Sequence, residues 1–325
     1  MTLLRPVLLE RRCLEKVWGG TALQSRLGIP LPPGQAVGET WELFDRKDGS
    51  SPLRDEQGLT LRSLMKEHAR DLLGSRVQPT PDGFFPLLLK FIDARDWLSV
   101  QVHPGAAQAR RQGDGPKSEA WVVLHAGPKP RIVRGVVPGT TRAQVEVAAR
   151  QGAAIEALLH SFTPRTGDVI DIPHGVVHAI GPDVVLFEVQ QNSDITYRIW
   201  DWGRDRPMHI DDALEALRVG DEGPATVAPV PIDAHGEWLL RTPHFRMRRM
   251  HCSTPATLGT EGSFKVMVVL EGMAAIGWRS GGQHPPVPVK ASDTLLVPAN
   301  AGSLFVSPIG PFEYLWIDGE SEGRH

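Results

Sequence analysis

A motif that occurs twice in the chain places the strongest restriction on its fold. Residues 166–173 read TGDVIDIP and residues 291–298 read ASDTLLVP, with Asp and Pro at matching places. A second pair lies upstream of these, VVLHAG at 122–127 and VVLEG at 268–272. Two copies of one structural unit explain both recurrences.

Short apolar runs separated by turn-forming residues indicate what each copy is made of. The 33 glycines and 28 prolines of the 325 residues are spread between these runs rather than clustered. Runs rich in Val, Ile, Leu, Phe and Trp with such boundaries are typical of β-strands. The expected strands are 39–44, 87–92, 98–103, 121–124, 169–172, 184–190, 238–241, 245–250, 265–270, 294–297 and 312–317. We therefore expect a mainly β fold.

Three segments have the residue spacing of helices. The first combines a helical apolar repeat with a capping threonine and a terminating glycine. The second is rich in alanine and accounts for most of the extra length of the first copy of the repeat. The predicted helices are 61–72 between Thr60 and Gly74, a small insertion at about 141–160 broken at Gly152, and 211–218 ended by Gly220.

The two copies differ in the residues able to carry chemistry. Five residues before the paired leucines stand Glu119 in the first copy and Lys265 in the second. Five residues after the paired prolines stand His178 and Ser303. Only the first copy therefore holds the side chains of a metal site.

The Pro-rich stretch at 223–231 divides the chain. We expect an N-terminal catalytic domain at 1–228, which carries the helical insertion, and a degenerate domain without a metal site at 229–325.

Composition excludes several classes of protein. With 35 Lys and Arg against 38 Asp and Glu, the formal charge of −3 argues against a nucleic-acid or anionic-membrane partner. Two cysteines make no disulfide framework, and no apolar run reaches the roughly 18 residues of a membrane span. The N-terminal segment is interrupted by Arg5 and Pro6 and is not typical of a secretory signal. We expect a cytoplasmic protein.

Two polar rows point to a site inside the first copy. In a strand, alternate residues face one side, so Ser99, Gln101 and His103 share a face with Val100 and Val102 behind them. Lys117, Glu119 and Trp121 share a face in the same way. A solvated edge strand and a solvated ion pair are the competing interpretations of these rows.

A third motif favours a metal site. Residues 167–178 fit G-x5-P-x-G-x2-H, the second motif of the cupin barrels, in which the turn at Gly175 aims His178 into the barrel. His174 is expected in that turn rather than among the ligands, because Pro173 and Gly175 argue against a helix. A mixed nitrogen and oxygen donor set without cysteine suits Zn²⁺, with Mn²⁺, Co²⁺ or Fe²⁺ as substitutes.

The chain resembles the type I mannose-6-phosphate isomerases in their short bacterial form with two cupin barrels. The resemblance rests on the segments 16–20, 38–43, 86–93, 98–104, 117–121, 167–181, 188–198 and 201–204. It implies one Zn²⁺ per chain held by Gln101, His103, Glu119 and His178, and an essential Arg198.

The implied reaction is the interconversion of mannose 6-phosphate and fructose 6-phosphate through a cis-enediol. Arg198 is a permanent cation that can hold a phosphate or a developing enediolate oxygen. Lys117 and Asp194 rank first as proton carriers, ahead of Glu188 and His103. Lys90, Ser99 and Glu188 are the expected substrate contacts, and Arg204 is a further phosphate candidate. The partner is a small sugar phosphate, and the protein is expected to be a monomer or homodimer.

Two other functions remain open from the residues. One is a non-catalytic metal-binding cupin that acts as a sugar sensor. The other is an Fe²⁺-dependent cupin oxygenase, since His103, Glu119 and His178 can compose a two-histidine, one-carboxylate triad. Retention of Lys117, Asp194 and Arg198 favours the isomerase, because a binding module has no evident need for them.

Overall fold

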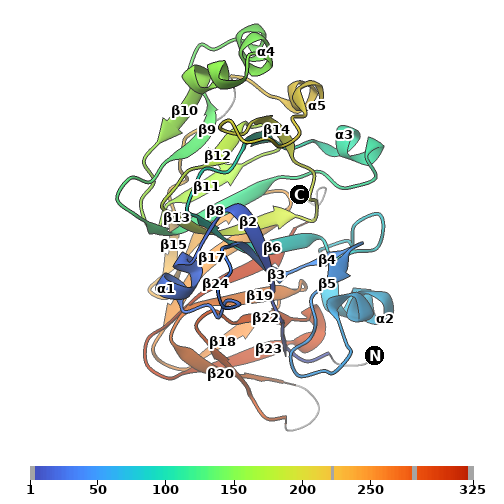
Figure 1. Cartoon of the computed structure of the whole chain (residues 1–325). Coiled ribbons are helices and arrows are strands. Elements are labelled where there is room, and N and C mark those ends of the chain that lie inside the picture. Colours follow the sequence, from blue (N-terminus) through green and yellow to red (C-terminus); the bar gives the residue numbers. More distant parts are fainter. Residues whose placement is uncertain (1–3, 221–222, 280–283, 321–325) are drawn as a thin grey trace.

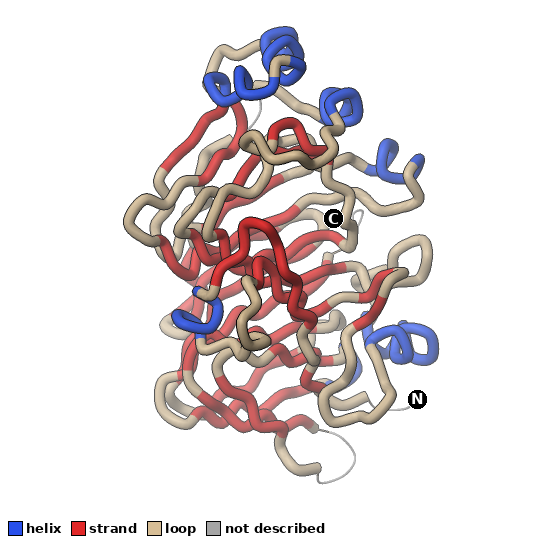
Figure 2. Tube along the Cα trace, in the orientation of Figure 1, coloured by secondary structure: helices blue, strands red, loops and turns tan. Residues whose placement is uncertain are grey.

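A computed structural model describes residues 4–220, 223–279 and 284–320, and it confirms a mainly β fold (Figures 1 and 2). Each strand expected from the sequence overlaps a strand of the structure. The expected strand at 98–103 is shorter, because only Val100–Val102 pairs as a strand. Most of the strands that the sequence did not predict lie in the two smaller sheets.

The N-terminal half forms a six-stranded and a five-stranded sheet. The six-stranded sheet has the order β11 (Val169–Ile172), β8 (Glu119–Ala126), β13 (Val184–Gln191), β6 (Leu87–Ala94), β3 (Val37–Leu43) and β2 (Arg12–Gly20). The five-stranded sheet has the order β10 (Leu159–Phe162), β9 (Ile132–Val136), β12 (His178–Ile180), β7 (Val100–Val102) and β14 (Tyr197–Trp200). A small hairpin joins β4 (Asp45–Arg46) and β5 (Gly49–Ser50).

The C-terminal half repeats this arrangement with a seven-stranded and a four-stranded sheet. The larger has the order β1 (Val7–Leu8), β22 (Thr294–Val297), β19 (Lys265–Glu271), β24 (Phe312–Gly319), β17 (Phe245–Cys252), β16 (Gly236–Arg241) and β15 (Val230–Asp233). The smaller has the order β18 (Ala256–Gly259), β23 (Ser303–Pro308), β20 (Met273–Trp278) and β21 (Val287–Lys290).

The repeated sequence motif corresponds to a repeated strand pairing. In the first copy Glu119 on β8 lies opposite Ile172 on β11. In the second, Lys265 on β19 lies opposite Val297 on β22. Both partners directly precede the repeated proline, so Lys265 occupies the ladder position of Glu119. Lys265 is fully buried and forms an ion pair with Asp318, so the second copy fills this position with a structural ion pair.

The four large sheets stack as layers, with the two largest back to back in the middle (Figure 1). Strand alternation explains the stacking. On β13, Val185 and Phe187 enter the core between the six- and seven-stranded sheets, whereas Leu186 and Glu188 face the interior of the N-terminal half. One strand thus supplies both the packing between the halves and a wall of the site.

Helices cover the outer face of the five-stranded sheet. The insertion forms α4 (Arg142–Arg150) and the 3₁₀ helix η1 (Gly152–Leu158), which confirms a break at Gly152. The predicted third helix is α5 (Ile210–Ala216), which ends before Gly220 because Leu217 already has an extended backbone. Val100 and Val102 pack into this helical layer, so Ser99 and Gln101 face inward as predicted.

The other helices lie at the periphery. In α2 (Leu61–Leu73), the Thr60 hydroxyl accepts from the Ser63 backbone N–H at 3.3 Å and Gly74 is the C-cap, as predicted. The short helices α1 (Ala22–Leu27), α3 (Ala106–Arg111) and η2 (Ala299–Ala301) were not predicted. Within the described ranges, no helix combines the length and the apolar character needed to cross a membrane.

Both halves contribute to one core. The N-terminal strand β1 pairs with β22 of the C-terminal half, and Phe85 packs on Phe264 with ring centroids 4.6 Å apart. The boundary between 1–228 and 229–325 stays a prediction.

Candidate active site

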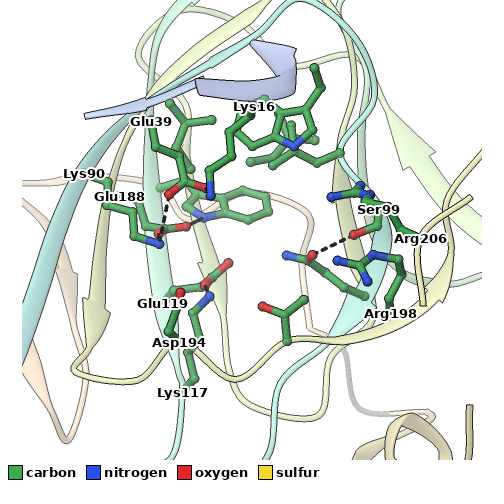
Figure 3. A pocket seen from close by; sticks show the side chains of 17 residues that line it. Lys16, Glu39, Lys90, Ser99, Lys117, Glu119, Glu188, Asp194, Arg198 and Arg206 are labelled. Carbon is green, nitrogen blue, oxygen red and sulfur yellow. Dashed lines mark hydrogen bonds and ion pairs between the residues drawn. The ribbon is translucent and has the colours of Figure 1, made fainter. Parts of the chain in front are cut away.

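A cavity of about 310 Å³ lies between the six-stranded and the five-stranded sheet (Figure 3). Strand alternation directs polar side chains of both sheets into it. The lining residues are Lys16, Trp18, Glu39, Lys90, Ile92, Leu98, Ser99, Gln101, Lys117, Glu119, Trp121, Ile180, Glu188, Asp194, Thr196, Arg198 and Arg206. The residues ranked first for catalysis and substrate binding therefore lie on the wall of one cavity, namely Arg198, Lys117, Asp194, Lys90, Ser99 and Glu188.

A buried cluster of possible metal ligands adjoins the cavity. His103 Nε2 lies 3.3 Å from Glu119 Oε2, and His178 Nε2 lies 3.5 Å from Glu119 Oε1. One donor atom from each residue can be chosen so that all lie within 4.8 Å of one another. Two imidazoles and a carboxylate at this spacing can share one divalent cation.

Backbone carbonyls orient both imidazoles of the cluster. His103 Nδ1 lies 2.9 Å from the carbonyl oxygen of Ile195, and His178 Nδ1 lies 2.9 Å from that of Val176. When Nδ1–H donates to a carbonyl, the Nε2 lone pair points toward Glu119 and is available to a metal. Burial and the positive charge of Lys117 lower the pKa of His103 to about 3, so its imidazole is neutral, as metal binding requires.

Two unpaired buried atoms of this cluster are suited to bind a cation. Among the described residues, His103 Nε2 and Glu119 Oε2 are buried and make no hydrogen bond, although Lys117 Nζ lies 3.2 Å from that carboxylate oxygen. Buried polar atoms in native proteins nearly always have a partner. The donor set therefore fits a metal ion.

Gln101 completes the predicted ligand set from the neighbouring strand. Its amide nitrogen lies 3.2 Å from His178 Nε2, and its Oε1 accepts from the Ser99 hydroxyl at 3.0 Å. A half-turn of the amide exchanges the two atoms and presents the oxygen to the cluster. Gln101 thus contacts His178 of the cluster, and its role as a fourth ligand stays a prediction.

Lys117 lines the cavity and contacts the cluster of His103, Glu119 and His178. It is buried, and its ammonium group contacts Glu119. Burial alone would raise the pKa of Glu119, but nearby charge, above all that of Lys117, lowers that pKa well below its usual range. Glu119 is therefore ionised and able to bind a cation.

A second group of charges forms the adjacent wall of the cavity (Figure 3). Lys90 Nζ lies 3.3 Å from Glu188 Oε1 and 3.8 Å from Glu39 Oε2. Trp121 Nε1 donates to Glu188 Oε2 at 3.0 Å. Burial and the nearby charge of Glu119 raise the pKa of Glu188 despite the presence of Lys90. The charge of Lys90 is thus balanced by two carboxylates.

Arg198 approaches from the five-stranded sheet. On β14 it lies opposite Gln101 in the strand ladder. Its Nη1 donates to the Pro207 carbonyl at 2.7 Å, while its Nε is buried and makes no hydrogen bond to any described residue. Arg198 lines the cavity, so its positive charge is available to a molecule bound there. Asp194 also lines the cavity but is exposed.

The expectations for Arg204 and His174 can be compared with their positions in the structure. Arg204 does not line the cavity in the part of the chain described, which contradicts its proposed phosphate contact. It is held instead by Asp201 at 3.0 Å and by Asp96 at 3.6 Å. His174 lies in the turn, as expected, and is not part of the metal cluster.

Sequence reasoning missed Lys16, Glu39 and Arg206 as cavity residues. Lys16 and Glu39 belong to the segments KVWGG and GETWEL, which carried the family resemblance, but no role was assigned to these two residues. Arg206 follows directly after the segment 201–204. The available signal was thus the family pattern rather than the chemistry of single residues.

Comparison with known proteins decides the family. Residues 7–126 match the family "Phosphomannose isomerase type I, catalytic domain". The mannose-6-phosphate isomerase of Streptococcus mutans is 32% identical over 286 residues, which cover 83% of this chain and 86% of that protein. The chain belongs to the type I phosphomannose isomerase family. The family resemblance expected from the sequence is confirmed.

Further members of the phosphomannose isomerase family match over most of their length. Mannose-6-phosphate isomerase ManA of Bacillus subtilis is 32% identical over 306 residues, which cover 89% of this chain and 91% of that protein. The crystal structure of the mannose 6-phosphate isomerase from Bacillus subtilis has a TM-score of 0.84 and 26% identity, covering 96% of this chain and 99% of that chain. The mainly β fold is thus that of a phosphomannose isomerase.

Proposed function

We propose that this chain is a metal-dependent isomerase that interconverts mannose 6-phosphate and fructose 6-phosphate. Membership of the phosphomannose isomerase family supports the reaction. The observation that carries the proposal is the buried cluster of His103, Glu119 and His178 at a cavity that also receives Arg198. The sensor alternative has no evident need for Arg198 on the cavity wall, and no observation favours the oxygenase.

The proposed cofactor is one Zn²⁺ per chain, with Mn²⁺, Co²⁺ or Fe²⁺ as substitutes. Gln101, His103, Glu119 and His178 would hold it, a nitrogen and oxygen set that suits these metals. A bound divalent cation supplies Lewis acidity toward the carbonyl and hydroxyl oxygens of the sugar.

The residues of the cavity would move one proton between two carbon atoms. A base removes the proton from C2 of the aldose, and the same proton or one from solvent is delivered to C1 of the cis-enediol. Lys117 lies beside Glu119, and Asp194 lines the cavity nearby, so both are placed to carry it. Glu188 is a third candidate, because its raised pKa lets it hold a proton at higher pH than an exposed carboxyl.

Arg198 would stabilise negative charge during this proton transfer. Arg198 lies opposite Gln101 in the strand ladder, and its Nε has no hydrogen-bond partner among the described residues. A fixed cation aimed at an oxygen that becomes negative stabilises the transition state more than the ground state.

Three further residues are proposed to contact the substrate. Lys90 on β6 and Ser99, which directly precedes β7, both line the cavity, so they can bind different ends of one sugar phosphate. Glu188 is placed to accept hydrogen bonds from sugar hydroxyl groups. The monomeric or dimeric state and the cytoplasmic location stay predictions.

Chelation followed by metal readdition tests the proposal. We expect the purified protein to convert mannose 6-phosphate, to lose activity on chelation, and to regain it with Zn²⁺ in a coupled assay. Arg198→Ala should retain the metal by elemental analysis but lose nearly all turnover, since removing one electrostatic donor costs roughly 100- to 1,000-fold. Full activity of the metal-free protein contradicts the proposal, as does oxygen uptake with Fe²⁺ in place of isomerisation.

A further inference from the structure

An irregular segment of β2 reaches over the cavity. The strand pairs with β3 at residues 12–15 and again at Gly20, and Glu15 and Gly20 both lie opposite Val37. Residues 16–19 therefore form an arch rather than a regular strand edge. Lys16 and Trp18 project from this arch into the cavity.

Two glycines let the arch lie against β3. A Cβ atom on Gly38 would be 2.6 Å from the Cβ of Lys16, and one on Gly19 would be 2.5 Å from the backbone nitrogen of Gly38. Both distances are far below van der Waals contact. The absence of side chains at these positions therefore places Lys16 at the cavity.

Lys16 differs from the other lysines of the cavity in the exposure of its side chain to solvent. Its ammonium group lies 3.3 Å from Glu39 Oε1, and its side chain is 34% exposed. Lys90 and Lys117 are each 5% exposed and are held by carboxylates within the wall. An ion pair at a partly exposed position contributes little free energy, so Lys16 can exchange its partner at low cost.

The other long cationic side chains of the cavity lie near other groups. Lys117 contacts Glu119, and Arg198 lies opposite Gln101, so both are beside the metal cluster. Arg206 makes two hydrogen bonds of 2.6 Å to the buried carboxylate of Asp201. Lys16 is on the opposite side of the cavity from Arg198 and Arg206 (Figure 3).

We propose that Lys16 binds the phosphate group of the substrate and thereby selects phosphorylated over free sugar. The inference rests on the proposed function, because the reacting end of the sugar must be at the metal cluster for the phosphate to reach the arch. On binding, the ammonium group leaves Glu39 and donates hydrogen bonds to phosphate oxygens. The dianionic phosphate is a stronger acceptor than a single carboxylate.

Lys16→Met tests this assignment. We expect the KM for mannose 6-phosphate to rise roughly 10- to 100-fold with little change in kcat, as for the loss of one charge-assisted hydrogen bond to a substrate. The inhibition constant of inorganic phosphate should rise by a similar factor, while kcat/KM for free mannose stays unchanged. Lys16→Arg should restore most of the affinity, since it keeps the charge. Lys66→Met, at an exposed position of α2, is the matched control.

The outcomes separate this inference from the proposed function. If the wild type does not convert mannose 6-phosphate, the proposed function is wrong. If the wild type converts it and Lys16→Met leaves both its KM and the phosphate inhibition constant unchanged, only the role of Lys16 is wrong. A thermal melt and metal content equal to those of the wild type show that the variant is folded. If Lys16→Met misfolds, a wild-type phosphate inhibition constant in Lys16→Ala likewise overturns the role.

Discussion

At the scale of single residues, the carboxylates of Glu39, Glu119 and Glu188 each lie close to a lysine side chain on the cavity wall. Glu39 accepts a hydrogen bond from Trp41 Nε1 at 2.8 Å and is close to both Lys16 and Lys90. Burial would raise the pKa of Glu39, but the two lysines and the indole N–H outweigh burial and lower it to about 2. Folding therefore favours the ionised carboxylate.

The lowered pKa of Glu39 predicts how the free energy of unfolding depends on pH. The pKa of Glu39 is lower in the folded than in the unfolded state, so its contribution is complete above about pH 4.5 and is lost as the pH falls toward 2. Linkage gives a loss of about 2 kcal/mol between pH 6 and pH 3 from this group. Glu39→Gln should be less stable at pH 6 and should lose less stability over that interval in urea unfolding.

Glu67→Gln on the exposed face of α2 is the control, and its pH profile should match that of the wild type. An identical pH profile for Glu39→Gln and the wild type would show that Glu39 does not cause this loss of stability at low pH.

At the scale of secondary structure, the site depends on how strands approach one another. β13 and β8 present alternate residues to the shared core and to the cavity, so a single shift in register would exchange Glu119 or Glu188 for an apolar neighbour. The arch of β2 is different, since its position depends on Gly38 rather than on a regular ladder.

Gly38→Ala should displace the arch. The added methyl group would overlap the Cβ of Lys16, which is close to the backbone and has little freedom to move. We expect a lower melting temperature, by an overpacking cost of about 1–3 kcal/mol, and a raised KM for mannose 6-phosphate. Gly259→Ala on β18 is the control, because the nearest atom to its added Cβ is 4.0 Å away. Wild-type KM and stability in Gly38→Ala would contradict the steric role of Gly38.

At the scale of the whole molecule, the two halves are joined by the back-to-back packing of their largest sheets. Phe264 is fully buried on the C-terminal side and contacts Phe85 from the N-terminal side. The same core contains side chains from β13, β8, β17, β19 and β24. The catalytic half therefore loses part of its core if the other half unfolds.

Phe264→Ala should destabilise both halves together. The cavity left by a buried aromatic ring costs about 3–5 kcal/mol, and we expect one cooperative transition at a lower urea midpoint. Tryptophan fluorescence and loss of isomerase activity should report the same midpoint. Phe305→Ala, where the ring is 40% exposed, should have a much smaller effect. Two separate transitions would show that the halves unfold independently.

The sequence alone determined most strands of the two large sheets, because strands buried on both faces are continuous apolar runs that local composition reveals. It did not indicate β1, β2 and β15. It also indicated the polar rows at Ser99–His103 and Lys117–Trp121, since alternation along a strand is a local property. Several short strands of the smaller sheets, such as β14 and β18, carry too little local pattern to be predicted.

Only the tertiary structure decided which charges share the cavity. Arg204 and Arg206 are two residues apart and chemically alike, yet only Arg206 lines the cavity, while Arg204 also pairs with Asp96. Lys16 reaches the site because Gly38, distant in the sequence, leaves room for it. Alternation is set within one strand, whereas the partner of a charge depends on segments that meet only after the sheets have packed.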